Sequence, residues 1–468
     1  MRMNQVFAGF LICGLVVGAG CSSSMKGSGS SWFGGSSFKV QAYETKTLPN
    51  GLTLIYVKDE SLPKVEIQAM VKTGLRQEAK EKAGLNSLVA SLLSQGTSTR
   101  SAVQISDAFN ALGTEFSASA GVDAVVANAD ALSSDADALL ALFADVLMKP
   151  TFATAEVNRL KSQRIAALKR RIDNPGNYSR RKFSEFLFSG TSYSRDTAGE
   201  VETIQALRQT DVIKHYLANY RPNNTIVAVT GRFDAAFAKK VEDVMGAWTS
   251  REIKPPAAEQ FPVTETLSVK LVSKKGLAQA QVLLGRPMIP RTHADYLALR
   301  VANEALGGGF GARLMQRIRD DLGLTYSVYS SLGSNQETGY FQIATFTKNP
   351  STGQTLKEVL KVYETFINEG ITDKELASAK AQIVGQYPRG LETADSVAST
   401  LMSLNLLGLP LSEIEAYPGR IEKLSLKEVN EAIRRHFKVG ALKALVYADR
   451  AAVGTQIQEF SPIVETAR

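Results

Sequence analysis

The length and composition of the chain exclude several classes of protein. At 468 residues, the chain favours two or more domains. A composition of 44% hydrophobic and 21% charged residues supports a large buried core and excludes disorder throughout. Lys and Arg number 54 against 46 Asp and Glu, a mild excess of eight without any basic run, so we expect no nucleic-acid partner. Two cysteines exclude a disulfide scaffold and a cysteine-rich zinc site.

The start of the chain has the pattern of a targeting segment. Arg2 precedes an apolar run from Val6 to Val17, which is too short for a spanning helix and typical of a signal peptide. Small residues then lead to Cys21, followed by a Ser/Gly-rich tether over residues 22–44. This order resembles a bacterial lipoprotein signal over residues 1–21, which implies a lipid on Cys21.

The same resemblance implies a location for the protein. We expect lipid anchoring in the bacterial cell envelope, and Ser22 after the cysteine favours the outer membrane, facing the periplasm. The alternative is an ordinary cleaved signal in which Cys21 is incidental.

The first half of the body mixes short strands with amphipathic helices. Asn50-Gly51 marks a hairpin, and alternation over 65–71 predicts a strand. Apolar residues at i, i+3, i+4 and i+7 predict a helix over 82–95, which Gly96 ends. The elements expected next are a helix at 102–112, strands at 115–119 and 123–131, and a helix at 134–148.

The second half repeats this order. We expect a strand at 280–285, helices at 293–306 and 312–321, strands at 325–332 and 339–346, and a helix at 352–369. The repeat predicts an internally duplicated α+β fold with two similar halves, each an antiparallel sheet covered by helices. The domains are expected at 45–250 and 263–468, joined by a polar, proline-rich linker at 251–262.

Several motifs resemble the pitrilysin–insulinase metallopeptidases, the inverzincins. Gly74-Leu-Arg-Gln-Glu78 resembles their Gly-x-Arg-x-Glu turn, and Tyr220-Arg-Pro-Asn-Asn resembles their Tyr-x-Pro-x-Asn strand. The segment from Leu306 to Tyr326, which contains three consecutive glycines, is similar to their most recognisable non-catalytic segment. The resemblance covers nearly all of residues 45–450 and implies a clamshell fold that closes around an extended peptide.

The resemblance also shows where the catalytic His-x-x-Glu-His motif would stand. In that motif two histidines bind zinc from one helix face, and the Glu activates the metal-bound water. Aligning Ala83-Gly84 before the helix and Gly96-Thr97 after it places Ser87, Ala90 and Ser91 at the His, Glu and His positions. The distal Glu of the family stands six residues before a family Asp that corresponds to Asp173, so it falls on Ala167. Independently of this alignment, no two histidines are four apart, because the only ones are His215, His293 and His436. We therefore expect no cofactor in this chain, and zinc only in a partner chain.

The chain keeps Arg319 and Tyr326, seven residues apart. In the family, an Arg and a Tyr at these positions reach across to the zinc-bearing half, where the Arg binds substrate and the Tyr supports the oxyanion. Donors of this kind stabilise a tetrahedral intermediate by ~3–4 kcal/mol each. The alternative is an Arg319 ion pair with Asp320 or Asp321 and a Tyr326 buried in the core.

Three functional hypotheses follow. The leading one is a zinc-less subunit of a two-chain peptidase, which supplies Arg319 and Tyr326 to a zinc-bearing homologous partner and binds extended peptides. The segment from Asn110 to Ala129 contains a strand that could accept such a peptide as an extra strand. The second hypothesis is a binding or assembly protein of the same fold without catalytic role. The third, an active single-chain peptidase, is nearly excluded by the missing histidines.

Overall fold

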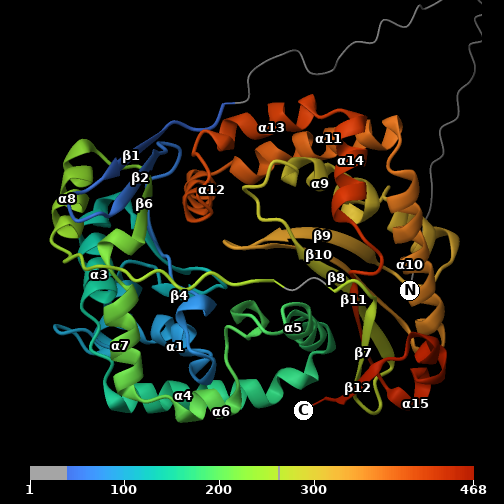
Figure 1. Ribbon diagram of the computed structural model, residues 1–468. Coiled ribbons are helices and arrows are strands. Elements are labelled where there is room, and N and C mark those ends of the chain that lie inside the picture. Colours follow the sequence, from blue (N-terminus) through green and yellow to red (C-terminus); the bar gives the residue numbers. More distant parts are fainter. Residues whose placement is uncertain (1–38, 262–263, 468) are drawn as a thin grey trace, which may run out of the picture. The chain divides into compact units, whose positions relative to one another are not determined.

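A computed structural model describes residues 39–261 and 264–467 (Figure 1). The expected signal peptide, Cys21 and most of the tether lie outside the described residues. Within the described residues, no helix combines the length and the apolar composition that crossing a membrane requires.

The first half forms a six-stranded sheet in the order β1-β2-β6-β3-β5-β4. Its strands are β1 Tyr43–Thr47, β2 Thr53–Lys58, β3 Lys64–Val71, β4 Ser117–Ala120, β5 Val125–Leu132 and β6 Thr225–Gly231. Its helices are α1 Leu85–Leu92, α2 Ala102–Ala111, α3 Ala136–Met148, α4 Thr154–Arg170, α5 Pro175–Leu187, α6 Val201–Ala206, α7 Gln209–Asn219 and α8 Ala235–Gly246.

The second half forms a six-stranded sheet in the order β12-β7-β11-β8-β10-β9. Its strands are β7 Ser268–Ser273, β8 Gln279–Met288, β9 Val328–Ser334, β10 Gly339–Lys348, β11 Lys443–Ala448 and β12 Ile463–Thr466. Its α-helices are α9 Tyr296–Asn303, α10 Thr352–Glu369, α11 Asp373–Gln386, α12 Ala394–Leu406, α13 Glu413–Lys423, α14 Leu426–His436 and α15 Arg450–Val453. Two π-helical turns, Glu304–Gly308 and Met315–Asp321, follow α9.

Five strands of each sheet share one connectivity, which confirms the predicted duplication, while the outermost strands β1 and β12 differ in direction. In the first, β6 runs parallel to β2 and antiparallel to β3, and β5 and β4 continue antiparallel. The second repeats this with β7, β11, β8, β10 and β9. The first sheet thus adds one parallel pair, β2–β6, to the predicted antiparallel strands, and the second adds two, β7–β11 and β7–β12. Long, mostly helical connections precede β6 and β11 and allow their parallel pairing.

The predicted elements are present, with ends that differ by a few residues. The Asn50-Gly51 turn joins β1 to β2, and Gly51 has φ 87°. The helix predicted over 82–95 is shorter, because Gly84, at φ 89°, stands at its N-cap. The helix predicted over 293–306 changes to a π-helical turn at Glu304, close to the consecutive glycines.

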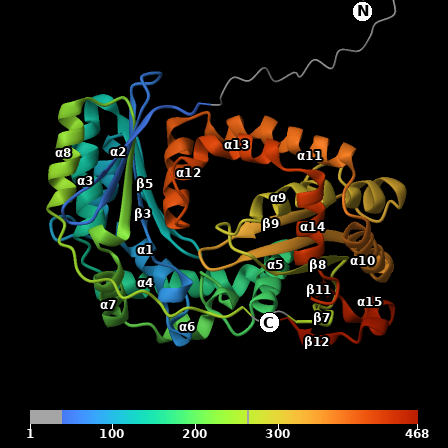
Figure 2. The same cartoon turned by 45° about the horizontal axis from the view of Figure 1, so that its top comes forward.

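The halves exchange equivalent helices. From the first half, α5 packs Tyr178, Phe183 and Leu187 against the second sheet. From the second half, α12 packs in the same way against β2 and β6 of the first sheet (Figures 1 and 2). The ammonium of Lys443, on β11, donates to the carbonyls of Phe186 at 2.8 Å and Leu187 at 3.2 Å. Each sheet therefore completes its core with a helix from the other half.

Residues 251–261 form no helix or strand and run along the first half. The Glu259 carboxylate accepts hydrogen bonds from the Ser192 backbone N–H at 3.1 Å and from its hydroxyl at 2.9 Å. The Phe261 ring stacks on Tyr193 with centroids 5.6 Å apart. These contacts hold the segment against the protein surface.

Candidate functional site

Three of the four residues at the expected zinc positions line one cleft of the first half. Ser87 and Ser91 lie one turn apart on α1, and the Ser91 hydroxyl donates to the Ser87 carbonyl at 3.0 Å. Ala167 stands on α4, which packs against α1. Ser87, Ser91 and Ala167 line a cleft of about 1550 Å³, whereas Ala90 is buried beneath it. The structure thus brings together the positions that the sequence aligned.

Arg164 binds both serines of α1. It lies on α4 one turn before Ala167, and its guanidinium donates to the Ser87 hydroxyl at 2.5 Å and the Ser91 hydroxyl at 3.0 Å. A longer bond of 3.4 Å reaches the Ser87 carbonyl. Burial lowers the pKa of Arg164 from its ordinary value, but the guanidinium stays charged. Sequence reasoning missed this residue.

These residues do not fit a zinc ion. Zinc in proteins takes imidazole, thiolate or carboxylate ligands, and none stands at these four positions. The guanidinium that binds both serine hydroxyls is a hydrogen-bond donor without a lone pair to offer a metal. A fixed positive charge on α4 therefore replaces the metal of a peptidase site.

The turn before α1 is built around a buried carboxylate. Glu78 accepts the backbone N–H groups of Gly84 at 3.1 Å and Asn86 at 2.5 Å, which satisfies donors at the start of the helix. Burial raises the pKa of Glu78 to about 7. The Asn86 side chain donates to the Thr73 carbonyl at 2.9 Å, and its oxygen lies 3.0 Å from Nε2 of His215. The Gly-x-Arg-x-Glu motif therefore orients α1 and keeps Ser87 and Ser91 towards the cleft.

His215 should make stability depend on pH. Burial lowers its pKa to about 4, so the unfolded chain takes up this proton at a higher pH than the folded chain. The free energy of unfolding should then fall as the pH drops from about 6.5 towards 4. We expect His215→Gln to reduce that loss by about 2–3 kcal/mol between pH 7 and 4.5. Urea unfolding of both proteins at pH 7 and 4.5 measures these free energies. If His215→Gln loses as much stability as the unmodified protein, His215 is not the cause of the pH dependence.

The structure brings two of the three histidines together, which their sequence spacing did not indicate. One ligand atom each from His293, Asp295 and His436 lies within 4.8 Å of the others. Nε2 of His436 is 2.6 Å from Oδ2 of Asp295, and the same oxygen binds Arg435. Since the carboxylate already carries two basic partners, the cluster joins α14 to the start of α9 as an ion-pair group.

We expect the purified chain to carry far less than one zinc ion per molecule. The α1 positions offer no ligands, and Arg435 competes for the carboxylate of the remaining cluster. Metal analysis of the protein after dialysis against metal-free buffer measures the content. A tightly held, stoichiometric zinc ion would contradict this expectation. If the ion persists in His436→Gln, it lies outside the His293 cluster, and the description of α1 is wrong.

Arg319 and Tyr326 lie side by side on the second half. The Arg319 guanidinium lies 5.2 Å from the centre of the Tyr326 ring and 5.7 Å from that of Phe310. Tyr326 is 76% exposed, which excludes a core role, and Arg319 also forms a 3.8 Å ion pair with Asp320. Gly323, at φ 60°, follows the end of the Met315–Asp321 turn and lies between Arg319 and Tyr326. Neither residue lines the cleft at Ser87.

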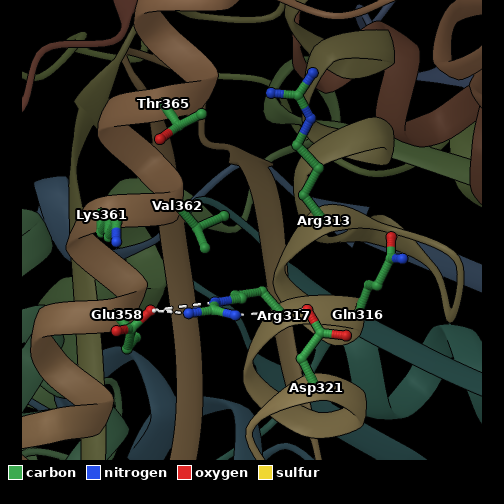
Figure 3. A pocket seen from close by; sticks show the side chains of 8 residues that line it. All are labelled: Arg313, Gln316, Arg317, Asp321, Glu358, Lys361, Val362 and Thr365. Atoms are coloured by element: carbon green, nitrogen blue, oxygen red, sulfur yellow. Dashed lines mark hydrogen bonds and ion pairs between the residues drawn. The ribbon is translucent and has the colours of Figure 1, made fainter.

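A smaller cavity of about 300 Å³ lies between the Met315–Asp321 turn and α10. Figure 3 shows Arg317 directed at Glu358, and the two side chains form a bridge of 3.2 Å. Asp321 lies 3.7 Å from the same guanidinium. Because Arg317 is already neutralised, this cavity is a weaker candidate for ligand binding than the cleft at Arg164.

Comparison with known families gives two matches that lie end to end. Residues 53–199 match the insulinase family, peptidase family M16, and residues 206–383 match the peptidase M16 inactive domain. The first match covers the first half from β2 to α5. The second match covers the rest of the first half from α7 and continues into α11 of the second half.

Curated relatives and solved structures agree with these matches. The chain is 27% identical over 401 residues to an uncharacterized zinc protease, YmxG, of Bacillus subtilis, covering 86% of this chain and 97% of the relative. It is 26% identical over 402 residues to the non-peptidase homolog YmxG of Helicobacter pylori, covering 85% and 92%. A peptidase M16 inactive domain from Pseudomonas fluorescens superposes with a TM-score of 0.80 at 25% identity, covering 88% of this chain and 99% of that one. A Helicobacter pylori protease, at 20% identity and a TM-score of 0.80, shares the fold.

The family matches, the duplicated sheets and the replaced ligand positions lead to one assignment. The chain belongs to the M16 (insulinase) peptidase family, as an inactive homologue.

Proposed function

We propose that the chain is the zinc-less subunit of a two-chain inverzincin peptidase. It binds extended peptides and supplies Arg319 and Tyr326 to the active site of a zinc-bearing homologous subunit. Zinc is needed only in that partner, and this chain carries no cofactor.

The observation that carries the proposal is the contrast between the two halves. At α1, Ser87 and Ser91 hold a guanidinium instead of a metal. On the second half, Arg319 and a largely exposed Tyr326 remain together, and neither lines the cleft at Ser87. An exposed Arg–Tyr pair of this kind is suited to a substrate bound between two subunits.

A strand edge offers a place for an extended peptide. Among the described strands, β4 pairs only with β5 and forms one edge of the first sheet. A peptide can add there as a further strand through backbone hydrogen bonds. The expected peptide-binding segment from Asn110 to Ala129 contains this edge.

One observation favours the second candidate, a binding or assembly protein. The cleft at Arg164 contains neither Arg319 nor Tyr326, so a ligand can occupy it without them. A protein of that kind would bind a partner or a peptide and leave cleavage unchanged.

Complex formation tests the proposal. The purified chain is mixed with a homologue from the same organism that carries His-x-x-Glu-His, and the mass of the product is measured by light scattering after size exclusion. We expect a heterodimer that neither chain forms alone. Two separate peaks at concentrations of tens of micromolar would contradict the two-chain proposal.

The lipid anchor is a separate proposal, based on the residues around Cys21. With Cys21→Ser we expect the protein to move from the membrane fraction to the soluble fraction, since the acyl chains on this residue provide the anchoring. Cys13→Ser, in the apolar run, is the matched control and should leave membrane association intact. Fractionation followed by immunoblotting measures both, and a membrane-bound Cys21→Ser protein would show that the anchor lies elsewhere.

A further inference from the structure

Arg164 is a half-buried cation without a carboxylate partner of its own. All three of its hydrogen bonds go to neutral oxygens of Ser87 and Ser91. Among the described residues, no carboxylate oxygen lies within 4.0 Å of the guanidinium. A charge withdrawn from water without a counter-ion costs free energy, which a bound anion would recover.

The nearest carboxylates are engaged elsewhere. Glu78 and Asp196 are the acidic groups whose charge acts on Arg164. The Glu78 carboxylate binds the backbone N–H groups at the start of α1. Asp196 pairs with Arg171 at 3.2 Å and with Arg181 at 3.8 Å. The charge of each acid therefore reaches Arg164 only from a distance, and neither forms a direct ion pair with it.

The walls of the cleft carry an excess of positive charge. Seven basic residues line it against four acidic ones: Lys80, Arg164, Lys169, Arg171, Arg181, Lys182 and Arg195 against Glu185, Asp196, Glu200 and Glu202. A basic cleft with low-dielectric walls raises the local concentration of anions. The side chain at its inner wall, where a peptidase would hold zinc, is the guanidinium that lacks a partner.

Arg164 also has donors left for a ligand. A guanidinium offers five N–H groups, and the bonds to Ser87 and Ser91 use three of them. The serine bonds fix the plane of the group, so a carboxylate meets a donor that is already oriented. Ser87 and Ser91 thus act as positioning residues for Arg164.

We propose that Arg164, held by Ser87 and Ser91, binds a carboxylate group of the peptide that enters the cleft. The group is either the C-terminal carboxylate or an Asp or Glu side chain, because both offer the same pair of acceptor oxygens. This inference rests on the proposed peptide-binding function and adds a preference for the charge of the ligand.

Three peptides test the proposal on the full chain. They are acetyl-pentaalanine with a free C-terminal carboxylate, its C-terminal amide, and the amide with a central glutamate. We expect one of the two acidic peptides to bind roughly tenfold or more tightly than the neutral amide, as charged hydrogen bonds to a partly buried guanidinium require. Isothermal titration calorimetry measures the three dissociation constants, and the acidic peptide that binds more tightly identifies the source of the carboxylate.

Variants assign the effect to Arg164. Arg164→Gln should remove the preference for the acidic peptide, while Lys169→Gln, which removes another cation of the cleft wall, should keep it. Equal binding of acidic and neutral peptides to the unmodified chain would overturn the proposal by itself, even if Arg164→Gln fails to fold. A preference that survives in folded Arg164→Gln would also overturn it. If the three peptides bind equally well, the proposed peptide-binding function stands and only the role of Arg164 is wrong. If no peptide binds, both the peptide-binding function and the role of Arg164 are wrong.

Discussion

Tyr326→Phe should lower the peptide-cleavage rate of the proposed two-chain complex by ~10²–10³-fold, because it deletes the one hydroxyl that we propose supports the oxyanion. Tyr326 is largely exposed, so the missing hydroxyl costs little stability. Arg319→Ala should reduce the rate as well and raise KM, since the proposed role of the guanidinium is to bind substrate. Initial rates at saturating partner, with kcat and KM determined separately, measure both effects.

A neighbouring arginine supplies the control. Arg317 lies two residues before Arg319, but its guanidinium is paired with Glu358 and Asp321 (Figure 3). Arg317→Ala should leave the rate within a few-fold of the unmodified complex. If the Tyr326 and Arg319 variants stimulate cleavage as strongly as the unmodified chain does, neither residue takes part. The chain would then be a binding subunit that retains only the fold.

Phe183→Ala should destabilise the protein by about 3–5 kcal/mol, with the loss concentrated in the second half. Phe183 belongs to α5 of the first half, yet its ring lies against Gly285 of β8, 3.1 Å from the position that a Cβ atom would take there. Removing the ring leaves a cavity between α5 and the second sheet. Hydrogen exchange of the β8 and β11 amides, together with urea unfolding, measures the effect.

Phe143→Ala is the matched control, because Phe143 is equally buried but lies within the core of the first half. Phe143→Ala should reduce the free energy of unfolding by a similar amount. Where the β8 and β11 amides exchange through local opening, their protection against hydrogen exchange should stay close to that of the unmodified protein. If Phe183→Ala lowers protection only in the first half, the exchange of α5 and α12 does not stabilise the sheets as described.

Local patterns predicted most of the elements but not how the halves fit together. Alternation and helical spacing found β3, α2, α3 and α10 within two residues of their ends. The exchange of α5 and α12 depends on contacts between residues more than 90 positions apart, such as Phe183 and Gly285. Periodicity reports which face of a helix is apolar and does not report which sheet covers it.

The sequence indicated where the candidate site lies but not which side chains interact there. The glycines around α1 drew attention to Ser87 and Ser91, which the structure places on α1 at the cleft. Arg164 carried a signal that was available, since it precedes Ala167 by one turn on α4. The cluster of His293 with His436 was invisible to spacing, because a sequence separation of 141 residues links Asp295 to His436.

The most direct test of the account is a titration of this chain into a fixed concentration of its zinc-bearing homologue. The account predicts no cleavage by this chain alone, because Ser87, Ala90, Ser91 and Ala167 offer neither zinc ligands nor a general base. It predicts that the cleavage rate of an unstructured peptide rises with added chain and reaches a plateau at equimolar amounts. A rate that stays at the level of the homologue alone, or zinc-dependent cleavage by this chain without its partner, would contradict the account.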